Sequence, residues 1–426
     1  MATIEPFRGI LYNKKIVDIS SVVTPPYDVI SPSMQNCFYS MDPYNIVRLI
    51  LSKAESGDSP KRNRHKRAKA FMDSWLKEKV LIKDDRPSIY VYAQSYLHKS
   101  KKRTRLGFIS LMKIEQPKES GVLPHEHTLD KPKVDRLNLI RETRANLSSI
   151  FSLYYDGKNI ISKALKSAIN AKMPYFELER DGVVHKLWRL DDKRIIKIVV
   201  SQMKDKKVFI ADGHHRYEAA LLYRNKMRKT RAFKRSMGYV MMYFANLSGR
   251  GDLTILSTHR AIKGIRHFSE DSVRSQLEKY FHVKDVRSMK EVMRSLESGR
   301  AGGHRFGMYT GKGRFSILTL RKACHPDRII GAVKTKALKR LDVTILHDIV
   351  INEILAVKKP ENNIKYIRDE ADAVKVVDKG SYQLTFFLKP TDVMDMKAVA
   401  EKGEMMPQKS TYFYPKLLTG LVINKF

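Results

Sequence analysis

The sequence predicts a mixed α/β fold, an α+β arrangement in which helices and strands are interspersed. Short β-type runs alternate with helical stretches from beginning to end, which indicates α/β or α+β layers rather than a helical bundle or a β-sandwich. The 426 residues, 42% of them hydrophobic, are enough for two or three lobes with separate cores. The composition is that of a folded globular protein and not of a disordered or collagen-like chain.

The first fifty residues are predicted to form an ordered loop, because turn signals dominate them. Pro25-Pro26 and Pro32 each force extended or turn geometry on the residue before them. Beyond them, Lys61 to Lys69 leads into a helix whose apolar side chains form one stripe. Two strand-like runs follow, and the basic residues between them indicate a hairpin tip at Lys99 to Arg105.

The rest of the chain is predicted to alternate in the same way. The elements we expect are a helix at Asp135–Asn146, strands at Ile195–Val200 and Val208–Ala211, a helix from Asp212 or Gly213 to about Met227, a helix near Val273–Tyr280, a β-hairpin at Phe306–Leu320 and an apolar helix within Leu341–Leu355.

The net charge is the strongest compositional signal. Lys and Arg number 81 against 45 Asp and Glu, which gives a formal charge of +36. Such a field attracts polyanions without specifying which, so non-specific nucleic-acid binding is one open interpretation. The other is a solvated basic surface, since the excess is spread along the whole chain.

No apolar run approaches the roughly 20 residues that span a bilayer, and Glu5 and Pro6 stand where a signal peptide would be apolar. We therefore expect a cytoplasmic protein with no membrane partner. Cys37 and Cys324 are far apart in the sequence and are interpreted as reduced thiols.

The strongest local motif is Val208 to Leu222, with the sequence VFIADGHHRYEAALL, in which an apolar strand stops and a helix begins at once. The first N–H groups of a helix lack internal partners, so this end can bind an anion. Gly213 allows close approach of a ligand, while His214, His215 and Arg216 offer proton donors for phosphate. Asp212 either caps the helix or orients a metal ion or a histidine. The structural alternative is that Asp212 only caps and the histidines only pack.

This motif resembles the signature of the ParB and sulfiredoxin-like superfamily, which binds nucleotide phosphates at such a turn. Its members include chromosome-partition CTPases, sulfiredoxin and an archaeal kinase of free serine, whose motif is the most similar. The resemblance implies a ParB/sulfiredoxin-like core elaborated by additional α/β segments. In the serine kinase an amino-terminal carboxylate is the base, and Asp28 beside Tyr27 is the motif acid that matches it. An Asp that only bonds its own turn is equally consistent with the sequence.

Over its whole length the chain resembles the uncharacterised family called domain of unknown function 1015. The motifs that carry this resemblance are Pro25 to Ile30 (PPYDVI), His125 to Thr128 (HEHT), Lys133 to Leu137 (KVDRL), the central ADGHHRYEAAL and Met406 to Leu417.

Further candidate groups lie in these motifs. Glu126 and His127 are expected to line the pocket. Lys133 and Arg136 either clamp a phosphate or belong to a solvated helix start. A zinc site at His125 and His127 lacks a defined third ligand, so we assign no metal ligands. Lys409 and Ser410 are expected to reach the pocket on a closing strand. The alternative is that this segment is an ordinary docked tail, because three aromatics in eight residues are more often part of a core.

Together these features predict a nucleotide-dependent phosphotransferase for a small hydroxyl metabolite, with free serine as one acceptor and ATP or ADP with Mg²⁺ as cofactor. The catalytic groups would be Asp28, Asp212 and His215. Residues 1–250 would form the phosphate-binding region, and residues 251–426 a second α/β lobe whose tail returns to the pocket. The alternative is a nucleotide-gated or non-enzymatic nucleic-acid-binding protein. The pattern specifies no oligomeric state.

Overall fold

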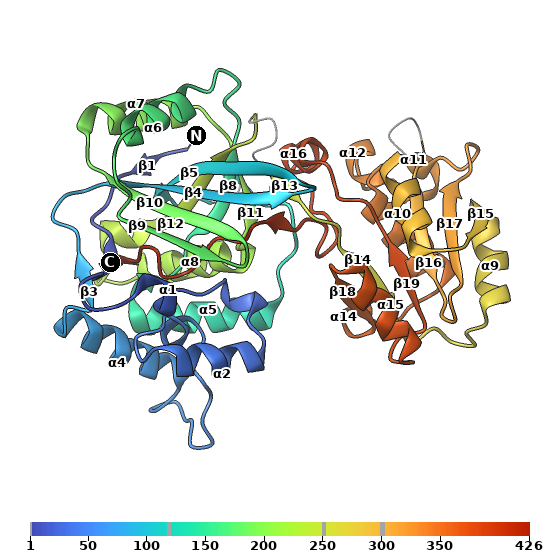
Figure 1. Cartoon of the computed structure of the whole chain (residues 1–426), viewed down its shortest axis with the longest axis horizontal. Coiled ribbons are helices and arrows are strands. Elements are labelled where there is room, and N and C mark those ends of the chain that lie inside the picture. Colours follow the sequence, from blue (N-terminus) through green and yellow to red (C-terminus); the bar gives the residue numbers. More distant parts are fainter. Residues whose placement is uncertain (1, 117–120, 249–252, 299–302) are drawn as a thin grey trace. The chain divides into compact units, whose positions relative to one another are not determined.

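The computed structural model describes residues 2–116, 121–248, 253–298 and 303–426 (Figure 1). The chain divides into two compact units. The first contains Met1–Pro124, Thr128–Thr254 and Pro415–Phe426, and the second contains His125–His127 and Ile255–Tyr414. Both units combine helices and sheets, so the predicted mixed α/β class is confirmed. The predicted boundary at residue 250 lies outside the described residues.

A nine-stranded sheet forms the centre of the first unit. Its order is β6-β11-β8-β12-β5-β4-β10-β9, with β1 paired to β5. Most neighbours are antiparallel, whereas β12 runs parallel to β8 and β11 parallel to β6. The strands of this unit are β1 (Ile4–Glu5), β2 (Ile10–Tyr12), β3 (Leu81–Lys83), β4 (Ile89–His98), β5 (Lys101–Lys113), β6 (Val122–Leu123), β7 (Ala145–Asn146), β8 (Ile150–Tyr154), β9 (Phe176–Arg180), β10 (Val183–Leu190), β11 (Val208–Asp212), β12 (Tyr239–Asn246) and β21 (Asn424–Lys425).

Helices pack around this sheet, and α5 packs against both α4 and α8. The helical elements of the first unit are α1 (Ile19–Val22), η1 (Tyr27–Val29), α2 (Pro32–Met41), α3 (Val47–Ile50), α4 (Arg64–Lys77), α5 (Asp130–Thr143), α6 (Ile160–Ile169), α7 (Lys193–Met203), α8 (His214–Met227) and η2 (Arg235–Gly238).

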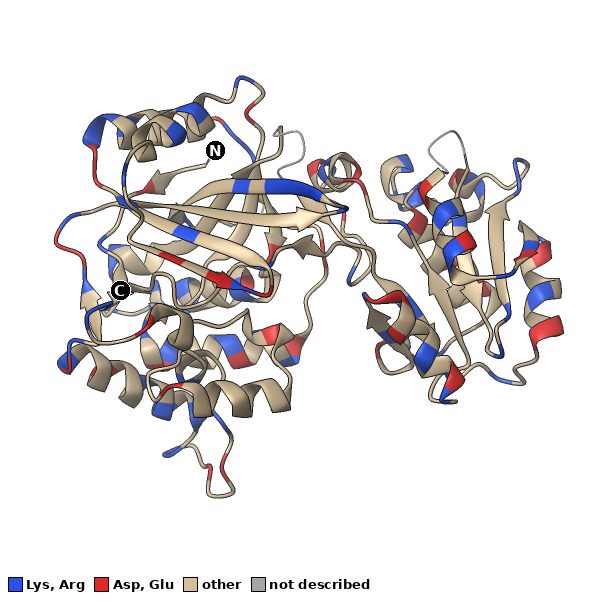
Figure 2. Ribbon diagram, viewed as in Figure 1, with Lys and Arg blue, Asp and Glu red and all other residues tan. Residues whose placement is uncertain are grey.

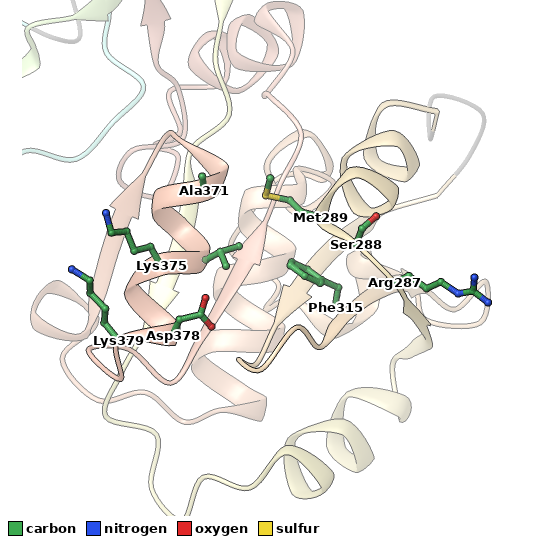
Figure 3. A pocket seen from close by; sticks show the side chains of 9 residues that line it. Arg287, Ser288, Met289, Phe315, Ala371, Lys375, Asp378 and Lys379 are labelled. Atoms are coloured by element: carbon green, nitrogen blue, oxygen red, sulfur yellow. The ribbon is translucent and has the colours of Figure 1, made fainter.

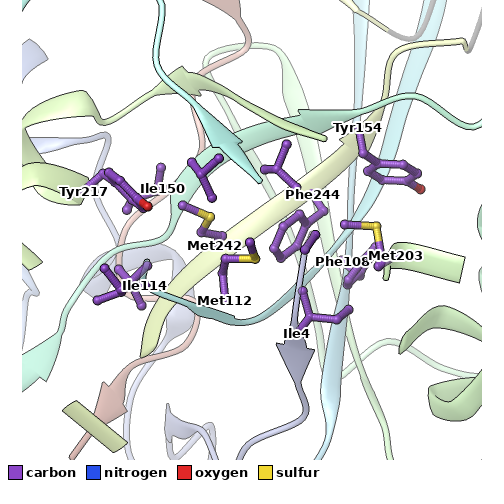
Figure 4. Close-up of a cluster of buried hydrophobic side chains, with 14 of the residues drawn as sticks. Ile4, Phe108, Met112, Ile114, Ile150, Tyr154, Met203, Tyr217, Met242 and Phe244 are labelled. Carbon is purple, nitrogen blue, oxygen red and sulfur yellow. The ribbon is translucent and has the colours of Figure 1, made fainter. Parts of the chain in front are cut away.

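The two faces of the sheet carry different buried side chains, because successive side chains along a strand point to opposite faces. Ile89 and Val91 of β4 and Phe108 of β5 belong to an apolar cluster that also includes residues of α6, α7 and α8 (Figure 4). Gln94 of β4 and Arg105 of β5 point to the other face, and they are equally buried but polar. They bind the carboxyl-terminal segment.

The strand predicted at Ile195–Val200 is wrong, because these residues lie in helix α7. Asp192 caps the helix by accepting hydrogen bonds from the N–H groups of Arg194 and Ile195. The buried positions Val199 and Met203 are four residues apart, which places them on one helical face. The cap and the helical spacing of the buried residues therefore decide the structure of this segment, although its β-branched residues favour a strand.

The amino-terminal segment also differs from the predicted loop. It contains β1, β2 and helices α1 to α3 in addition to the turn at Tyr27–Val29. Ser31 accepts a hydrogen bond from the N–H of Met34, and Pro32 occupies the first helical position of α2. The pair Ser31-Pro32, which is also typical of a turn, is therefore a helix start here.

The basic hairpin tip is shorter than predicted. Strand β5 begins at Lys101, which leaves Lys99 and Ser100 as the tip, both with positive φ. Arg105 is fully buried. The helix predicted after Lys61 is confirmed as α4, and that predicted after Gly213 as α8.

The second unit contains a six-stranded sheet of order β15-β17-β16-β19-β14-β18. The predicted hairpin at Phe306–Leu320 is confirmed as β16 and β17. The strands are β13 (Thr254–Ile255), which begins at the division between the units, β14 (His259–Ile262), β15 (Phe281–Val286), β16 (Arg305–Tyr309), β17 (Phe315–Leu320), β18 (Ile364–Ile367), β19 (Leu384–Phe387) and β20 (Phe413–Tyr414).

The helices of the second unit include a π-helix, η3, where the apolar helix was predicted. They are α9 (Glu270–Glu278), α10 (Met289–Ser298), α11 (Pro326–Ile329), α12 (Lys336–Lys339), α13 (Asp342–Ile345), η3 (Leu346–Ile354), α14 (Pro360–Asn363), α15 (Glu370–Asp378) and α16 (Val393–Glu401). Within the described ranges, no helix has the length and hydropathy that crossing a membrane requires.

Candidate functional site

The turn between β11 and α8 combines a strand end with an open helix start. Asp212 is the last residue of β11, and His214 is the first residue of α8. Gly213 between them has φ +98°, a conformation that side chains disfavour. It has no side chain with which to cap the helix. The first N–H groups of α8 and its dipole therefore make this turn electropositive.

Arg216 folds back over Gly213. A Cβ atom on Gly213 would come within 2.8 Å of Nε and of one terminal nitrogen of Arg216, so any larger residue would displace the guanidinium. The guanidinium donates to the Ser149 carbonyl at 2.6 Å and to Asp212 Oδ2 at 2.9 Å. Its Nε is buried and makes no hydrogen bond within the described part of the chain. This nitrogen is a donor in need of an acceptor.

Asp212 is held between two cations. Besides Arg216, Lys416 approaches its Oδ1 with Nζ at 2.7 Å. Two buried polar side chains of the sheet fix the backbone of this lysine. Gln94 donates to the Lys416 carbonyl at 2.9 Å, and Arg105 donates to the Pro415 carbonyl. Sequence reasoning missed Lys416. The signal was its place at the end of the basic and aromatic carboxyl-terminal motif.

Tyr27 lies among the charges of this site. The Arg136 guanidinium stacks on its ring at 3.9 Å from the centroid. Burial raises the pKa of the Tyr27 hydroxyl, and Arg136 and Arg216 lower it. Asp28 and Asp212 act in the raising direction. The structure therefore brings together five groups from three predicted motifs.

Asp28 differs from the other acids of the site in its accessibility. It is exposed in the short helix η1, and none of the described side chains makes a hydrogen bond or ion pair with it. A carboxylate in this state can accept a proton from a ligand.

Arg136 is fixed from behind by a buried ion network. Its Nε donates to Asp135 Oδ2 at 3.0 Å, and its Nη1 donates to the Ile50 carbonyl at 2.8 Å. Asp135 also binds His65 Nε2 at 2.9 Å and Arg64. Burial acts to raise the pKa of Asp135, but the His65 hydrogen bond and the two arginines hold it well below its usual range. Arg136 is thus prepositioned on Tyr27.

The histidines and Lys133 lie at the contact of α8 with α5. His215 Nε2 accepts from the N–H of Leu129, the residue before α5, at 2.9 Å. His214 is buried. Lys133 pairs with Asp130 at 2.8 Å and approaches Glu218 at 3.8 Å. These contacts join the two helices.

Four of the predicted substrate-binding residues, Glu126, His127, Lys409 and Ser410, lie in the second unit. There the two family motifs meet, since the Met406 N–H donates to the His125 carbonyl at 2.7 Å. The Lys409 carbonyl accepts from the buried Arg260 at 3.1 Å, and Ser410 is buried. His127 is exposed.

Glu126 is one of the charges that act on Arg260. Burial lowers the pKa of the Arg260 guanidinium to about 10, while Tyr366 and Glu126 act to raise it. Glu126 and Lys409 therefore both contribute to a second polar cluster, around Arg260 in the second unit.

Among the described residues, no three His, Cys, Asp or Glu side chains come together as metal ligands. His125 Nε2 lies 3.0 Å from Thr411 Oγ1, and Asp212 is occupied by two cations. A resident magnesium ion does not fit at Asp212.

The family model described as "Protein of unknown function (DUF1015)" matches residues 4–344. The match covers most of the chain, so the chain belongs to this family, as its motifs predict. No curated protein matches the chain.

Three solved structures show how far structural likeness extends. A conserved hypothetical protein from Pyrococcus furiosus has a TM-score of 0.34 and 14% identity, over 70% of this chain and 89% of that chain. A free serine kinase in complex with AMP has a TM-score of 0.33 and 15% identity, over 69% and 83%. SbnI with a C-terminal truncation, from Staphylococcus aureus, has a TM-score of 0.36 and 10% identity, over 73% and 85%. Scores of this size do not transfer an activity.

Replacing Asp135 with Asn should destabilise the first unit by about 2 to 4 kcal/mol at pH 7, because Arg64 and Arg136 lose their shared carboxylate. The folded-state pKa is lowered, so the stabilisation is present above the unfolded pKa of about 4 and is lost as the pH falls below it. The measurement is urea unfolding followed by tryptophan fluorescence. Both tryptophans, Trp75 and Trp188, lie in the first unit.

The matched control is Asp130→Asn on the same helix, which removes an exposed pair with Lys133 and should cost less than about 1 kcal/mol. Equal effects of the two substitutions, or a difference that persists unchanged at pH 2, would contradict the buried network.

Proposed function

We propose that the site around Tyr27 and the β11–α8 turn binds the phosphates of a nucleotide and transfers one of them to a small hydroxyl compound. The observation that supports this most is the buried Arg216 Nε, a donor with no acceptor in the described chain, beside the start of α8. A phosphate oxygen is an acceptor of the right charge for both groups.

The charges of the site favour a phosphate over a neutral ligand. The positive charges of Arg136 and Arg216 both act on Tyr27, and Lys416 forms an ion pair with Oδ1 of Asp212. Because Asp212 already faces two cations, its role in the proposal is to orient Arg216 and Lys416. His214 and His215 contribute the first turn of α8, and Gly213 allows the phosphate to approach the backbone.

Asp28 is the proposed general base. It would take the proton from the acceptor hydroxyl while that oxygen bonds to the phosphorus of the terminal phosphate. The bond from this phosphorus to the bridging oxygen then breaks, and the nucleotide leaves with one phosphate fewer. The positive groups at the turn would stabilise the charge of the transferring group, which is the main requirement of phosphoryl transfer.

Magnesium, in this proposal, is brought by the nucleotide. Such an ion is held largely by phosphates and water, needs only one or two carboxylates, and neutralises phosphate charge. ATP and ADP are the donors to assay. Free serine is the first acceptor to assay, because the ADGHHR motif resembles that of the archaeal serine kinase.

The charge favours a second candidate, in which the protein binds nucleic acid with or without nucleotide. Lys and Arg lie on helices and strands of both units (Figure 2), and the formal charge is +36. Charge alone would give affinity that falls steeply with salt and ignores sequence. Catalysis by the site around Tyr27 would separate the two candidates.

Replacing Arg216 with Ala should weaken binding of ADP or ATP with Mg²⁺ by roughly tenfold to a hundredfold, since a charge-assisted contact is worth about 1.5 to 3 kcal/mol. Isothermal titration calorimetry measures this directly. Arg228→Ala is the matched control, because Arg228 is exposed just beyond the other end of the same helix. Equal affinity of wild type and Arg216→Ala would remove the phosphate site from this turn.

Replacing Asp28 with Asn should leave nucleotide affinity nearly unchanged and lower phosphoryl transfer by about a hundredfold or more, because the amide cannot accept the proton. The assay follows transfer of labelled phosphate from the nucleotide to L-serine and other small hydroxyl compounds. Asp85→Asn, at another exposed acid of the first unit, is the control. Full activity in Asp28→Asn would show that another group takes the proton.

A further inference from the structure

The second unit has a cavity of about 570 Å³ that is separate from the polar cluster around Arg260. One wall is helix α15, and the other is formed by the corner before α10 and by strand β17 (Figure 3). Its lining residues are Arg287, Ser288, Met289, Phe315, Ala371, Val374, Lys375, Asp378 and Lys379. Sites for small organic ligands have volumes of roughly 300 to 1,000 Å³.

Helix α15 offers one continuous face to this cavity. Ala371, Val374, Lys375 and Asp378 follow a spacing of three and four residues, which places them on the same side of the helix. Val374 and Phe315 are only partly buried and pack against the apolar core of the unit. The cavity therefore has an apolar centre with an aromatic ring.

Cations stand at the edges of this apolar centre. Figure 3 shows Lys375 and Lys379 extending from α15 on one side and Arg287 on the other, with Phe315 and Met289 between them. All three cations are exposed, and no described acidic group forms an ion pair with any of them. Their charge is therefore available to a ligand.

The lining contains one acid, Asp378. Asp378 Oδ1 accepts from the Tyr309 hydroxyl at 2.5 Å, and the Tyr309 ring packs on Phe315 with centroids 4.5 Å apart. On the opposite wall, the Ser288 hydroxyl accepts from the N–H of Glu291 at 3.3 Å. These contacts fix the aromatic floor and both walls without using the cations.

We propose that this cavity binds a small organic anion with an apolar, preferably aromatic, body. The ring would contact Phe315, Met289 and Val374. The anionic group would pair with Lys375 and Lys379. This site is independent of the nucleotide site proposed for the first unit, so either proposal can fail alone.

The test uses the full chain and 1-naphthalenesulfonate, an aromatic anion that is not a phosphoryl donor. Binding is followed by its fluorescence and by calorimetry. Methanesulfonate and 1-naphthalenemethanol supply the anion and the ring separately, and each should bind at least about tenfold more weakly, because each keeps only part of the contacts.

The double variant Lys375→Gln with Lys379→Gln should weaken 1-naphthalenesulfonate binding about tenfold or more. Ala371→Glu should weaken it independently, since it adds a carboxylate to the lining at an exposed helical position. The control, Lys284→Gln with Lys365→Gln, removes two exposed lysines of the same unit that do not line the cavity. It should bind as wild type does.

Absence of binding to wild type would overturn the proposal, as would affinity unaffected by both lining variants. Loss of binding in Arg216→Ala would place the probe in the first unit and would also overturn it. Binding of a single-stranded oligonucleotide through Lys375 and Lys379, without binding of 1-naphthalenesulfonate, would assign this cavity to nucleic acid instead.

Discussion

The candidate site depends on the neutralisation of Asp212 by Arg216 and Lys416. A carboxylate at the end of β11 would repel an anion at the start of α8, whereas a carboxylate paired with two cations holds those cations in place. Arg216 is close in sequence, but Lys416 is more than two hundred residues away. The buried side chains of Gln94 and Arg105 bind the carbonyls on which its position depends.

The two faces of the central sheet have different roles. One face supplies the core with α6, α7 and α8. On the other face, Gln94 and Arg105 fix the carboxyl-terminal segment by hydrogen bonds, which specify position better than apolar contacts because they are directional. The network of Asp135 plays the same part for Arg136, on which Tyr27 stacks. The side of the site that carries Tyr27 is therefore supported by buried charges behind it.

Much of this arrangement could be predicted from local signals. The strand, turn and helix at Val208–Met227 follow from an apolar run, a glycine and a helical period, and the structure has them there. Two errors had local causes: α7 was mistaken for a strand because of its β-branched residues, and α2 for a loop because Ser31-Pro32 is also a turn signal. The pairing of Lys416 with Asp212 could not be derived, since a long-range contact leaves no local period or spacing. The placement of Glu126 and Lys409 in the second unit is of the same kind.

The central claim is that a nucleotide phosphate binds where Arg216 and the first turn of α8 meet. The most direct measurement is a crystal structure of the chain with ADP and Mg²⁺. The account predicts a phosphate oxygen within hydrogen-bonding distance of Arg216 Nε and of an N–H in the first turn of α8, with Asp28 facing the ligand. ADP bound elsewhere, with Arg216 Nε still making no contact to it, would contradict the account.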